Sequence, residues 1–237
     1  MHRSAPRLTR LLACAAVPVM LVVAGCSSDS GSSGKKSSST SSAKPSASAS
    51  PTVAKAVYAK LPDACKSVPG KTVSDLVPKA KDKSGTEVKS TDLSARAGCS
   101  WNGLESKGTK GSQYRWLSVS YLRFGSDTVL GSGQKRAQDQ YAKAVADAKA
   151  TDGAKSVKTV NTPGIGNEAT TVTYEQRKTD ADFSYAVVIT RTENVVTTVN
   201  HNGAGYEGLK SPSAGDMSKG AQTAAKAAVA SVASANK

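Results

Sequence analysis

Apolar and polar positions alternate along several segments of the chain, and this pattern predicts where strands form. In residues 114–124, YRWLSVSYLRF, the side chains of Leu117, Val119 and Tyr121 share one side, whereas Ser118 and Ser120 take the other. A period of two residues is typical of a strand with one buried face. The same criterion predicts further strands at residues 86–93, 97–102, 169–176, 182–191 and 195–200.

Three other segments have the apolar spacing of helices. Residues 134–150 place Ala137, Tyr141, Ala144 and Val145 on one stripe, and alanines form a similar stripe in the segment that follows Asp216. Asp216 is expected to cap this last helix, and Thr72 a short one at residues 73–77 that Pro78 ends.

The predicted elements follow the same order in the two halves of the chain after residue 52. Residues 53–152 and 153–237 each give a three-strand meander followed by a helix. Because alanine stripes let helices approach a sheet closely, the sequence predicts an α+β fold, an antiparallel sheet with the helices packed on it.

The N-terminal residues have the layout of a secretory signal. Three arginines, within residues 3–10, precede an apolar run at residues 11–23, which is too short to span a bilayer. Leu21, Ala24, Gly25 and Cys26 follow the lipobox pattern, so this segment resembles the signal of a bacterial lipoprotein. The resemblance implies that residues 1–25 are removed and that Cys26 carries a lipid such as a palmitate-containing diacylglyceryl group. An ordinary secretory signal, with Cys26 as a stray thiol, is the alternative.

Residues 26–52 are predicted to be a disordered tether. Between residues 27 and 51 the chain is rich in serine and contains no valine, leucine or aromatic residue, so burial cannot offset the entropy of ordering it. Its root-mean-square span is roughly 25–30 Å. The sequence therefore predicts a lipid-anchored protein on the outer face of the cell membrane, with an extracytoplasmic domain at residues 53–237.

Cys65 and Cys99 are the only cysteines after Cys26. In an exported chain such a pair is typical of a disulfide, and closing a loop of this length stabilises a fold by roughly 3–4 kcal/mol in the chain-entropy model. A metal site is disfavoured because no histidine lies near either cysteine. Trp101 is expected on the same strand face as Cys99, where the indole can pack on the bridge.

Four short motifs carry a further resemblance. They are the lipobox at Cys26, the segment Asp63-Ala64-Cys65, the segment Gly98-Cys99-Ser100-Trp101, and residues 164–169, GIGNEA. In these the chain resembles uncharacterised actinobacterial lipoproteins with a cysteine pair and, more distantly, the extracellular sensor domains of actinobacterial receptor kinases. The resemblance implies an α+β fold with a cysteine pair and no established reaction.

Two glycine-rich segments resemble nucleotide-binding motifs but have the wrong context. Gly164, Gly166 and Ala169 satisfy the dinucleotide spacing, yet a threonine-rich, strand-like segment follows instead of a helix. This predicts a tight turn that enters a strand. Residues 103–110 end in Thr-Lys and are expected to form a hairpin loop.

Few residues are candidates for catalysis. His201 is the only histidine after residue 2, so a multi-histidine metal site is excluded, and its HNGAG context predicts a surface loop at a strand end. We therefore assign no catalytic residue, no metal ligand and no cofactor. The expected function is binding of a ligand or partner without catalysis. The competing class is an envelope hydrolase or transferase, for which an acid pair or His201 would line a deep pocket.

Charge bears on the choice of partner. The chain carries a net charge of +14, of which about +9 remains on the predicted domain, because residues 1–52 hold six Lys and Arg but one Asp. This favours an anionic envelope polymer, with an amphiphile or an envelope protein as alternatives. Nucleic acid is disfavoured, because the lysines form no stripe with aromatic residues.

A binding site is expected where the sheet meets a helix. The glycine-rich loops at residues 125–133 and 202–215 would border it, and Leu122, Val187 and Ile189 would line its interior.

Overall fold

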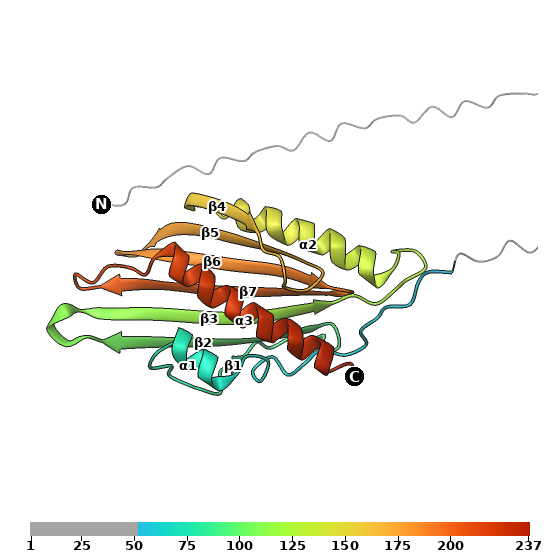
Figure 1. Ribbon diagram of the computed structural model, residues 1–237, viewed down its shortest axis with the longest axis horizontal. Helices are drawn as coiled ribbons and strands as arrows, with labels where there is room; N and C mark the ends of the chain where they lie inside the picture. Colours follow the sequence, from blue (N-terminus) through green and yellow to red (C-terminus); the bar gives the residue numbers. More distant parts are fainter. Residues whose placement is uncertain (1–51) are drawn as a thin grey trace, which may run out of the picture. The chain divides into compact units, whose positions relative to one another are not determined.

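The computed structural model describes residues 52–237, which form an antiparallel sheet flanked by helices (Figure 1). The predicted signal peptide, Cys26 and the tether up to residue 51 lie outside the described residues. The α+β class is as predicted. The elements are α1 (Gly70–Leu76), β1 (Thr86–Glu87), β2 (Arg96–Ser106), β3 (Ser112–Arg123), α2 (Gly133–Lys149), β4 (Lys155–Asn161), β5 (Glu168–Lys178), β6 (Ala181–Thr192), β7 (Val195–Tyr206) and α3 (Ala214–Ser234), with a 3-10 turn at Gly108–Lys110.

The sheet has the strand order β1-β2-β3-β7-β6-β5-β4. The two meander-plus-helix units therefore meet at the centre, where β3 pairs with β7 and Leu117 lies opposite His201. The second unit has four strands instead of the predicted three. Its extra strand, β4, is exposed along its whole length, so its sequence KSVKTVN shows none of the apolar alternation that marks a half-buried strand.

Helices cover both faces of the sheet and give it three layers. On β6 the side chains of Ala186 and Val188 pack on the α3 side, whereas Val187 and Ile189 pack on the α2 side. In Figure 1, α3 crosses in front of the central strands and α1 lies in front of β2.

The helix ends differ slightly from the prediction. Ser213, not Asp216, caps α3: its Oγ accepts a hydrogen bond from the Asp216 amide at 3.0 Å, and Asp216 lies three residues further on. The predicted alanine stripe of α3 is buried. Helix α1 begins after Pro69, so Thr72 lies inside it.

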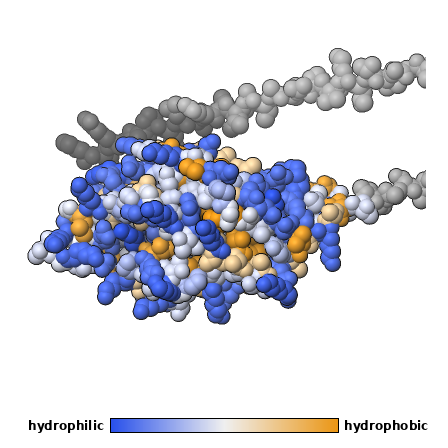
Figure 2. All heavy atoms as spheres, in the orientation of Figure 1, coloured by the Kyte–Doolittle hydropathy of each residue, from blue (hydrophilic) through white to orange (hydrophobic). Residues whose placement is uncertain are grey.

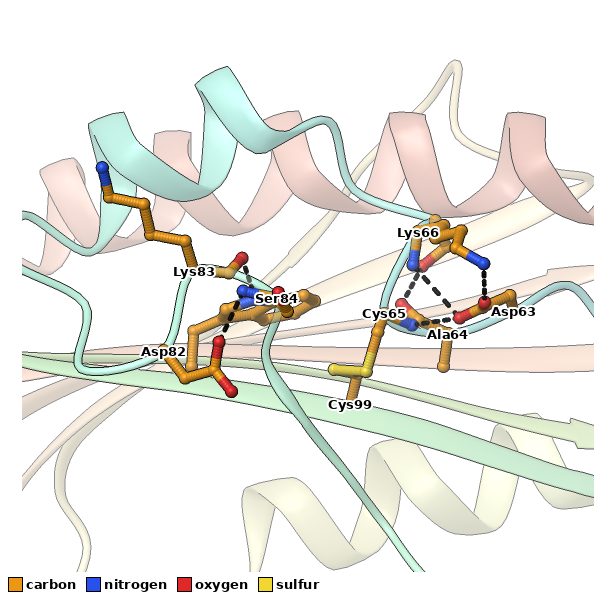
Figure 3. Close-up of a disulfide and its surroundings, with 10 residues drawn as sticks. Asp63, Ala64, Cys65, Lys66, Asp82, Lys83, Ser84 and Cys99 are labelled. Carbon is orange, nitrogen blue, oxygen red and sulfur yellow. Dashed lines mark hydrogen bonds and ion pairs between the residues drawn. A yellow bond between two sulfur atoms is a disulfide. The ribbon is translucent and has the colours of Figure 1, made fainter.

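Cys65 and Cys99 form the predicted disulfide, with their Cα atoms 5.1 Å apart (Figure 3). Asp63 supports the segment before α1, because its carboxylate accepts the amides of Cys65 and Lys66. Trp101 shares the buried face with Cys99, and its indole N–H donates to the Lys83 carbonyl at 3.3 Å. The bridge thus ties the chain before α1 to β2.

The antiparallel strands give the sheet two distinct ends. At the arm end, the N-terminal arm (residues 52–62) lies beside the β6–β7 turn, the start of α2 and the end of α3. At the hairpin end lie the β2–β3 hairpin (residues 106–112), the β5–β6 turn (178–181) and the β7–α3 loop (207–213). Figure 1 shows the described arm and the C-terminus at the same end.

Candidate functional site

His201 lies inside β7, not in a surface loop as predicted. It is 2% exposed, and its Nδ1 and Nε2 atoms each lie 3.2 Å from a carbonyl oxygen, those of Met217 and Leu76. Strand β7 continues past His201 because β3 and β6 pair with it on both sides. Burial lowers the pKa of His201 despite the two nearby carbonyls, which favour the charged ring. Both ring nitrogens are therefore occupied by the protein's own carbonyls.

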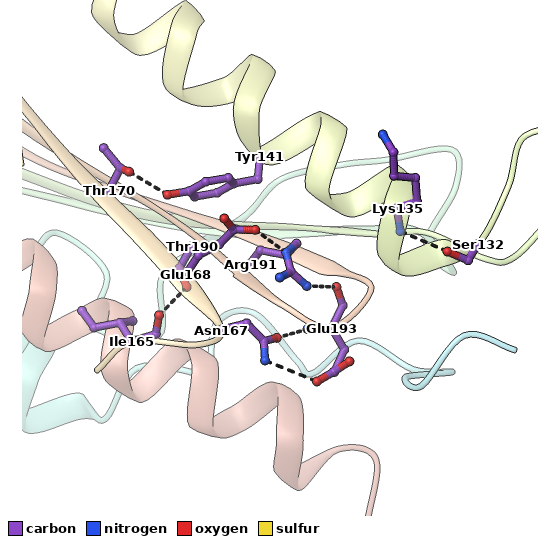
Figure 4. Close-up of polar contacts among 10 residues, drawn as sticks. All are labelled: Ser132, Lys135, Tyr141, Ile165, Asn167, Glu168, Thr170, Thr190, Arg191 and Glu193. Carbon is purple, nitrogen blue, oxygen red and sulfur yellow. Dashed lines mark hydrogen bonds and ion pairs between the residues drawn. The ribbon is translucent and has the colours of Figure 1, made fainter. Parts of the chain in front are cut away.

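The segment at residues 164–169 is the tight turn that the sequence predicts (Figure 4). Gly166 has a positive φ of 65°, and a Cβ there would lie 2.5 Å from the Arg191 carbonyl oxygen. Asn167 accepts the Glu193 amide, and Thr190 donates to the Ile165 carbonyl. These bonds fasten the turn to the β6–β7 hairpin, and strand β5 follows it directly.

The pocket predicted between the two glycine-rich loops does not form. The loop after β3 lies at the arm end, whereas the loop after β7 lies at the hairpin end, because the two strands pair antiparallel. Much of residues 202–215 is also strand or helix. Val187 and Ile189 are buried under α2, with Leu122 packed against them. These side chains line a closed core.

The face that carries α3 is mostly hydrophilic at its surface, with apolar atoms in separate patches (Figure 2). Its alanine stripe points inward. The opposite face of the sheet is covered by a helix over only part of its width, because α2 packs mainly on β5, β6 and β7.

The half of that face near β2 and β3, which we call the open face, carries small polar side chains and one tryptophan. Paired positions place Ser100 beside Ser118 and Asn102 beside Trp116. Asn200 lies on β7 opposite Ser118, and its side-chain oxygen accepts a hydrogen bond from the side-chain Nδ2 of Asn202 at 3.0 Å. Residues of this kind offer hydrogen bonds without a net charge.

The open face ends in a groove of about 660 Å³ at the hairpin end. Leu104 is 52% exposed there and lies opposite Tyr114. The residues that line the groove on adjacent strands are Asn102, Leu104, Ser112, Tyr114 and Tyr206. They combine an apolar surface with amide and hydroxyl groups, which is the usual composition of a small-ligand site.

An aromatic cluster supports the floor of the groove. The Phe183 ring lies edge-on to Tyr114, with centroids 5.9 Å apart, and to Tyr206 at 6.5 Å. Beyond it, Tyr185 stacks on Tyr174 at 4.7 Å. Rings from four strands therefore brace one another, which holds the tyrosines of the groove in fixed orientations. In the sequence, Tyr114 and Trp116 lie on the opposite side from Leu117, and this alternation could have revealed an aromatic second face.

The charged groups at the groove rim include both signs. Lys81 lies on one side, and Asp180 and Glu207 lie at the turns on the other. Ser112 donates a hydrogen bond to the Glu207 carboxylate at 3.0 Å. The residues that line the groove therefore carry no net positive charge that would select a polyanion.

A second groove, of about 740 Å³, lies beside the first and includes Lys155, Arg177 and Lys210 together with Glu175 and Asp182. Arg177 and Asp182 pair at 3.1 Å. Its lining is polar and balanced in charge, and it has Phe183 as its aromatic residue. We therefore take the groove at Tyr114 and Tyr206 as the candidate site.

Within residues 52–237 no three His, Cys, Asp or Glu side chains are grouped as metal ligands, and no helix has the length and apolarity needed to cross a bilayer. No known protein family, curated protein or solved structure matches this chain. The resemblance to cysteine-pair lipoproteins stays a prediction from the sequence motifs.

Proposed function

We propose that the protein is a cell-envelope lipoprotein, anchored through Cys26, whose extracytoplasmic domain binds an uncharged, hydroxyl-rich chain such as an envelope glycan and does not transform it. The lipobox and the polar segment after it support the anchor. The groove at the hairpin end supports the ligand class.

The observation that carries this proposal is the composition of the groove. Tyr114, Tyr206 and Leu104 offer apolar surface to the C–H faces of a sugar, and Asn102 and Ser112 offer neutral donors and acceptors to its hydroxyls. The open face continues this polar surface along β2 and β3, so an extended chain can lie across it. With Lys81 opposed by two carboxylates, recognition in the groove does not depend on an anionic ligand.

The competing proposal is an envelope hydrolase or transferase. A reaction that used His201 would need the imidazole to reach the substrate, but both ring nitrogens lie against backbone carbonyls beneath α1 and α3. This geometry favours the binding proposal.

The test is co-sedimentation of the detergent-solubilised full chain with insoluble cell-wall glycan. Leu104→Asn and Tyr206→Ala should each weaken binding roughly fivefold or more, because an interface side chain that matters contributes over about 1 kcal/mol. Leu93→Asn is the matched control: Leu93 is also exposed but lies at the arm end. Binding by the wild type and the control should persist in 1 M salt.

Three results would contradict the proposal. Equal binding by all variants would place recognition elsewhere. Loss of binding in high salt would assign it to the basic surface and an anionic polymer. Release of soluble sugar by the wild type would make the protein an enzyme.

A further inference from the structure

Two large apolar side chains protrude from the loop between β3 and α2. Val129 is 89% exposed and Leu130 is 61% exposed. They occupy the tip of a tight turn at residues 127–131, which we call the apolar tip. Exposing these apolar side chains to water is unfavourable, and a partner that covered them would lower the free energy of the system.

The apolar tip has a fixed conformation. The Asp127 carboxylate accepts the amides of Val129 and Leu130, both at 2.8 Å. Asp127 and Gly131 also exchange two backbone hydrogen bonds, at 3.0 and 2.9 Å. The backbone amides of residues 127, 129, 130 and 131 are thus bonded within the turn, which lowers the cost of moving them out of water.

The loop is also fastened to the N-terminal arm. Ser126 donates to the Ala54 carbonyl at 2.6 Å and accepts the Gly133 amide at 3.0 Å. The start of α2 is thereby held against the arm. The tip lies three residues beyond Ser126, so it is next to the place where the chain from Cys26 joins the domain.

The arm itself is hydrogen-bonded to the β6–β7 turn and to the chain just after α3. Asn194 accepts the Tyr58 amide at 2.8 Å and donates to the Tyr58 carbonyl, and Asn236 accepts the amides of Ala59 and Lys60. These bonds fix the point from which the tether leaves. The predicted tether, with an expected root-mean-square span of roughly 25–30 Å, would keep that end of the domain close to a bilayer that holds Cys26.

We propose that the apolar tip, Val129 and Leu130, inserts shallowly into the outer face of the membrane and orients the anchored domain. The inference rests on the proposed anchoring at Cys26. Two other exposed apolar side chains, Val57 on the arm and Leu93 before β2, lie at the same end. With this end on the bilayer, the groove at Tyr114 and Tyr206 faces away from the membrane.

The tip orients the domain and does not anchor it. Two aliphatic side chains bury less apolar surface than one acyl chain, which alone gives only marginal attachment. The ionised Asp127 at the base of the turn, bonded to two amides, restricts insertion to a shallow depth.

The experiment uses the lipidated full chain in vesicles of phosphatidylglycerol and phosphatidylethanolamine that contain a doxyl-labelled lipid. A fluorophore is attached at Val129→Cys or, as the control, at Thr109→Cys in the β2–β3 hairpin at the opposite end. Doxyl quenching should be at least threefold stronger at position 129. Adding Leu130→Asp should reduce quenching at position 129 to the level at position 109, while the chain still floats with the vesicles.

Three other results would each overturn the tip proposal. Chains that float with the vesicles but show equal quenching at the two positions would overturn the tip proposal and leave the anchor intact. Wild-type chains that do not float would overturn the anchor and the tip proposal with it. A position 129 label that is shielded from iodide without vesicles, in the unanchored Cys26→Ser chain, would assign the tip to a contact with a second copy and also overturn the proposal.

Discussion

Asn194 joins three segments that are far apart in the sequence. Its side chain is fully buried in the β6–β7 turn and bonds the Tyr58 amide, the Tyr58 carbonyl and the Phe124 carbonyl at 2.8–2.9 Å. Its own backbone carbonyl accepts the Phe124 amide. One amide group therefore satisfies the arm and the end of β3 together.

Asn194→Ala should lower the free energy of unfolding by about 2–4 kcal/mol, because it removes three hydrogen bonds from part-buried backbone groups of Tyr58 and Phe124. Urea denaturation followed by circular dichroism measures the change. Asn161→Ala, at an exposed position on β4, is the control and should change stability by less than about 0.5 kcal/mol. Equal effects of the two substitutions would contradict this role of Asn194.

The titration of His201 makes the stability of the fold depend on pH. Its folded pKa lies below the ordinary 6.5, mainly because burial disfavours the imidazolium, with Arg115 nearby adding repulsion. The unfolded chain then binds a proton near pH 6.5 that the folded chain does not. Stability is therefore lost as the pH falls from about 6.5 toward the lower folded pKa.

The free energy of unfolding should fall between pH 7 and pH 5 by at most about 1.4 kcal/mol per pH unit. His201→Gln should remove this dependence. Asp63, Asp92 and Asp127 have pKa values lowered from 3.8 by their hydrogen bonds. Their protonation therefore reduces stability only at a lower pH than that of His201. A stability that rises toward pH 5 in the wild type would mean that the charged ring is preferred between its two carbonyls.

At the scale of the element, α3 lies close to the sheet through small residues. Ala221, Ala224, Ala225 and Ala228 are fully buried, and Gly220 lies over His201. A Cβ at Gly220 would lie 2.6 Å from His201 Nδ1 and 2.8 Å from Leu76 Cδ2. The His201 ring is fixed between two carbonyls and cannot move away.

Gly220→Ala should therefore destabilise the protein by about 1–3 kcal/mol, although alanine is the better helix former by about 1 kcal/mol. Gly215→Ala, in the first turn of the same helix, meets only Ser213 Oγ at 3.6 Å and should be neutral or slightly stabilising. Thermal unfolding of both variants measures these changes in stability. A gain in stability at both positions would show that α3 can move outward.

At the scale of the whole molecule, the domain has two different ends. The arm end holds the N-terminal arm, the C-terminus and the apolar tip, and the hairpin end holds the groove and its aromatic cluster. Sheet strands of up to 12 residues separate the two ends. An anchor at one end and recognition at the other would let the protein reach a polymer beyond the membrane.

Cys26→Ser should move the protein from the membrane fraction to the medium, or leave an uncleaved precursor, because two acyl chains are what secures the attachment. Fractionation followed by mass measurement detects either result. Ser27→Ala is the control and should stay processed and membrane-bound. A processed Cys26→Ser chain that remains in the membrane fraction would show that another part of the protein holds it there.

The sequence by itself determined the elements whose burial repeats with a regular period. The alternation in β3 and β6 and the alanine stripe of α3 indicated strands, a helix and the α+β class, because side-chain direction in these elements follows directly from residue spacing. The disulfide was likewise predictable, from the predicted export of the chain and the absence of other cysteines or histidines nearby. Strand β4 was missed because an edge strand exposed along its length has no such period.

Only the tertiary structure decided which segments meet. The pairing of β3 with β7 placed the two glycine-rich loops at opposite ends, buried His201 between two helices and brought Tyr114, Phe183 and Tyr206 together. Residue spacing specifies which way a side chain points relative to its own strand or helix. It does not specify which distant strand pairs with it or which helix covers it, because those contacts depend on the packing of the whole chain.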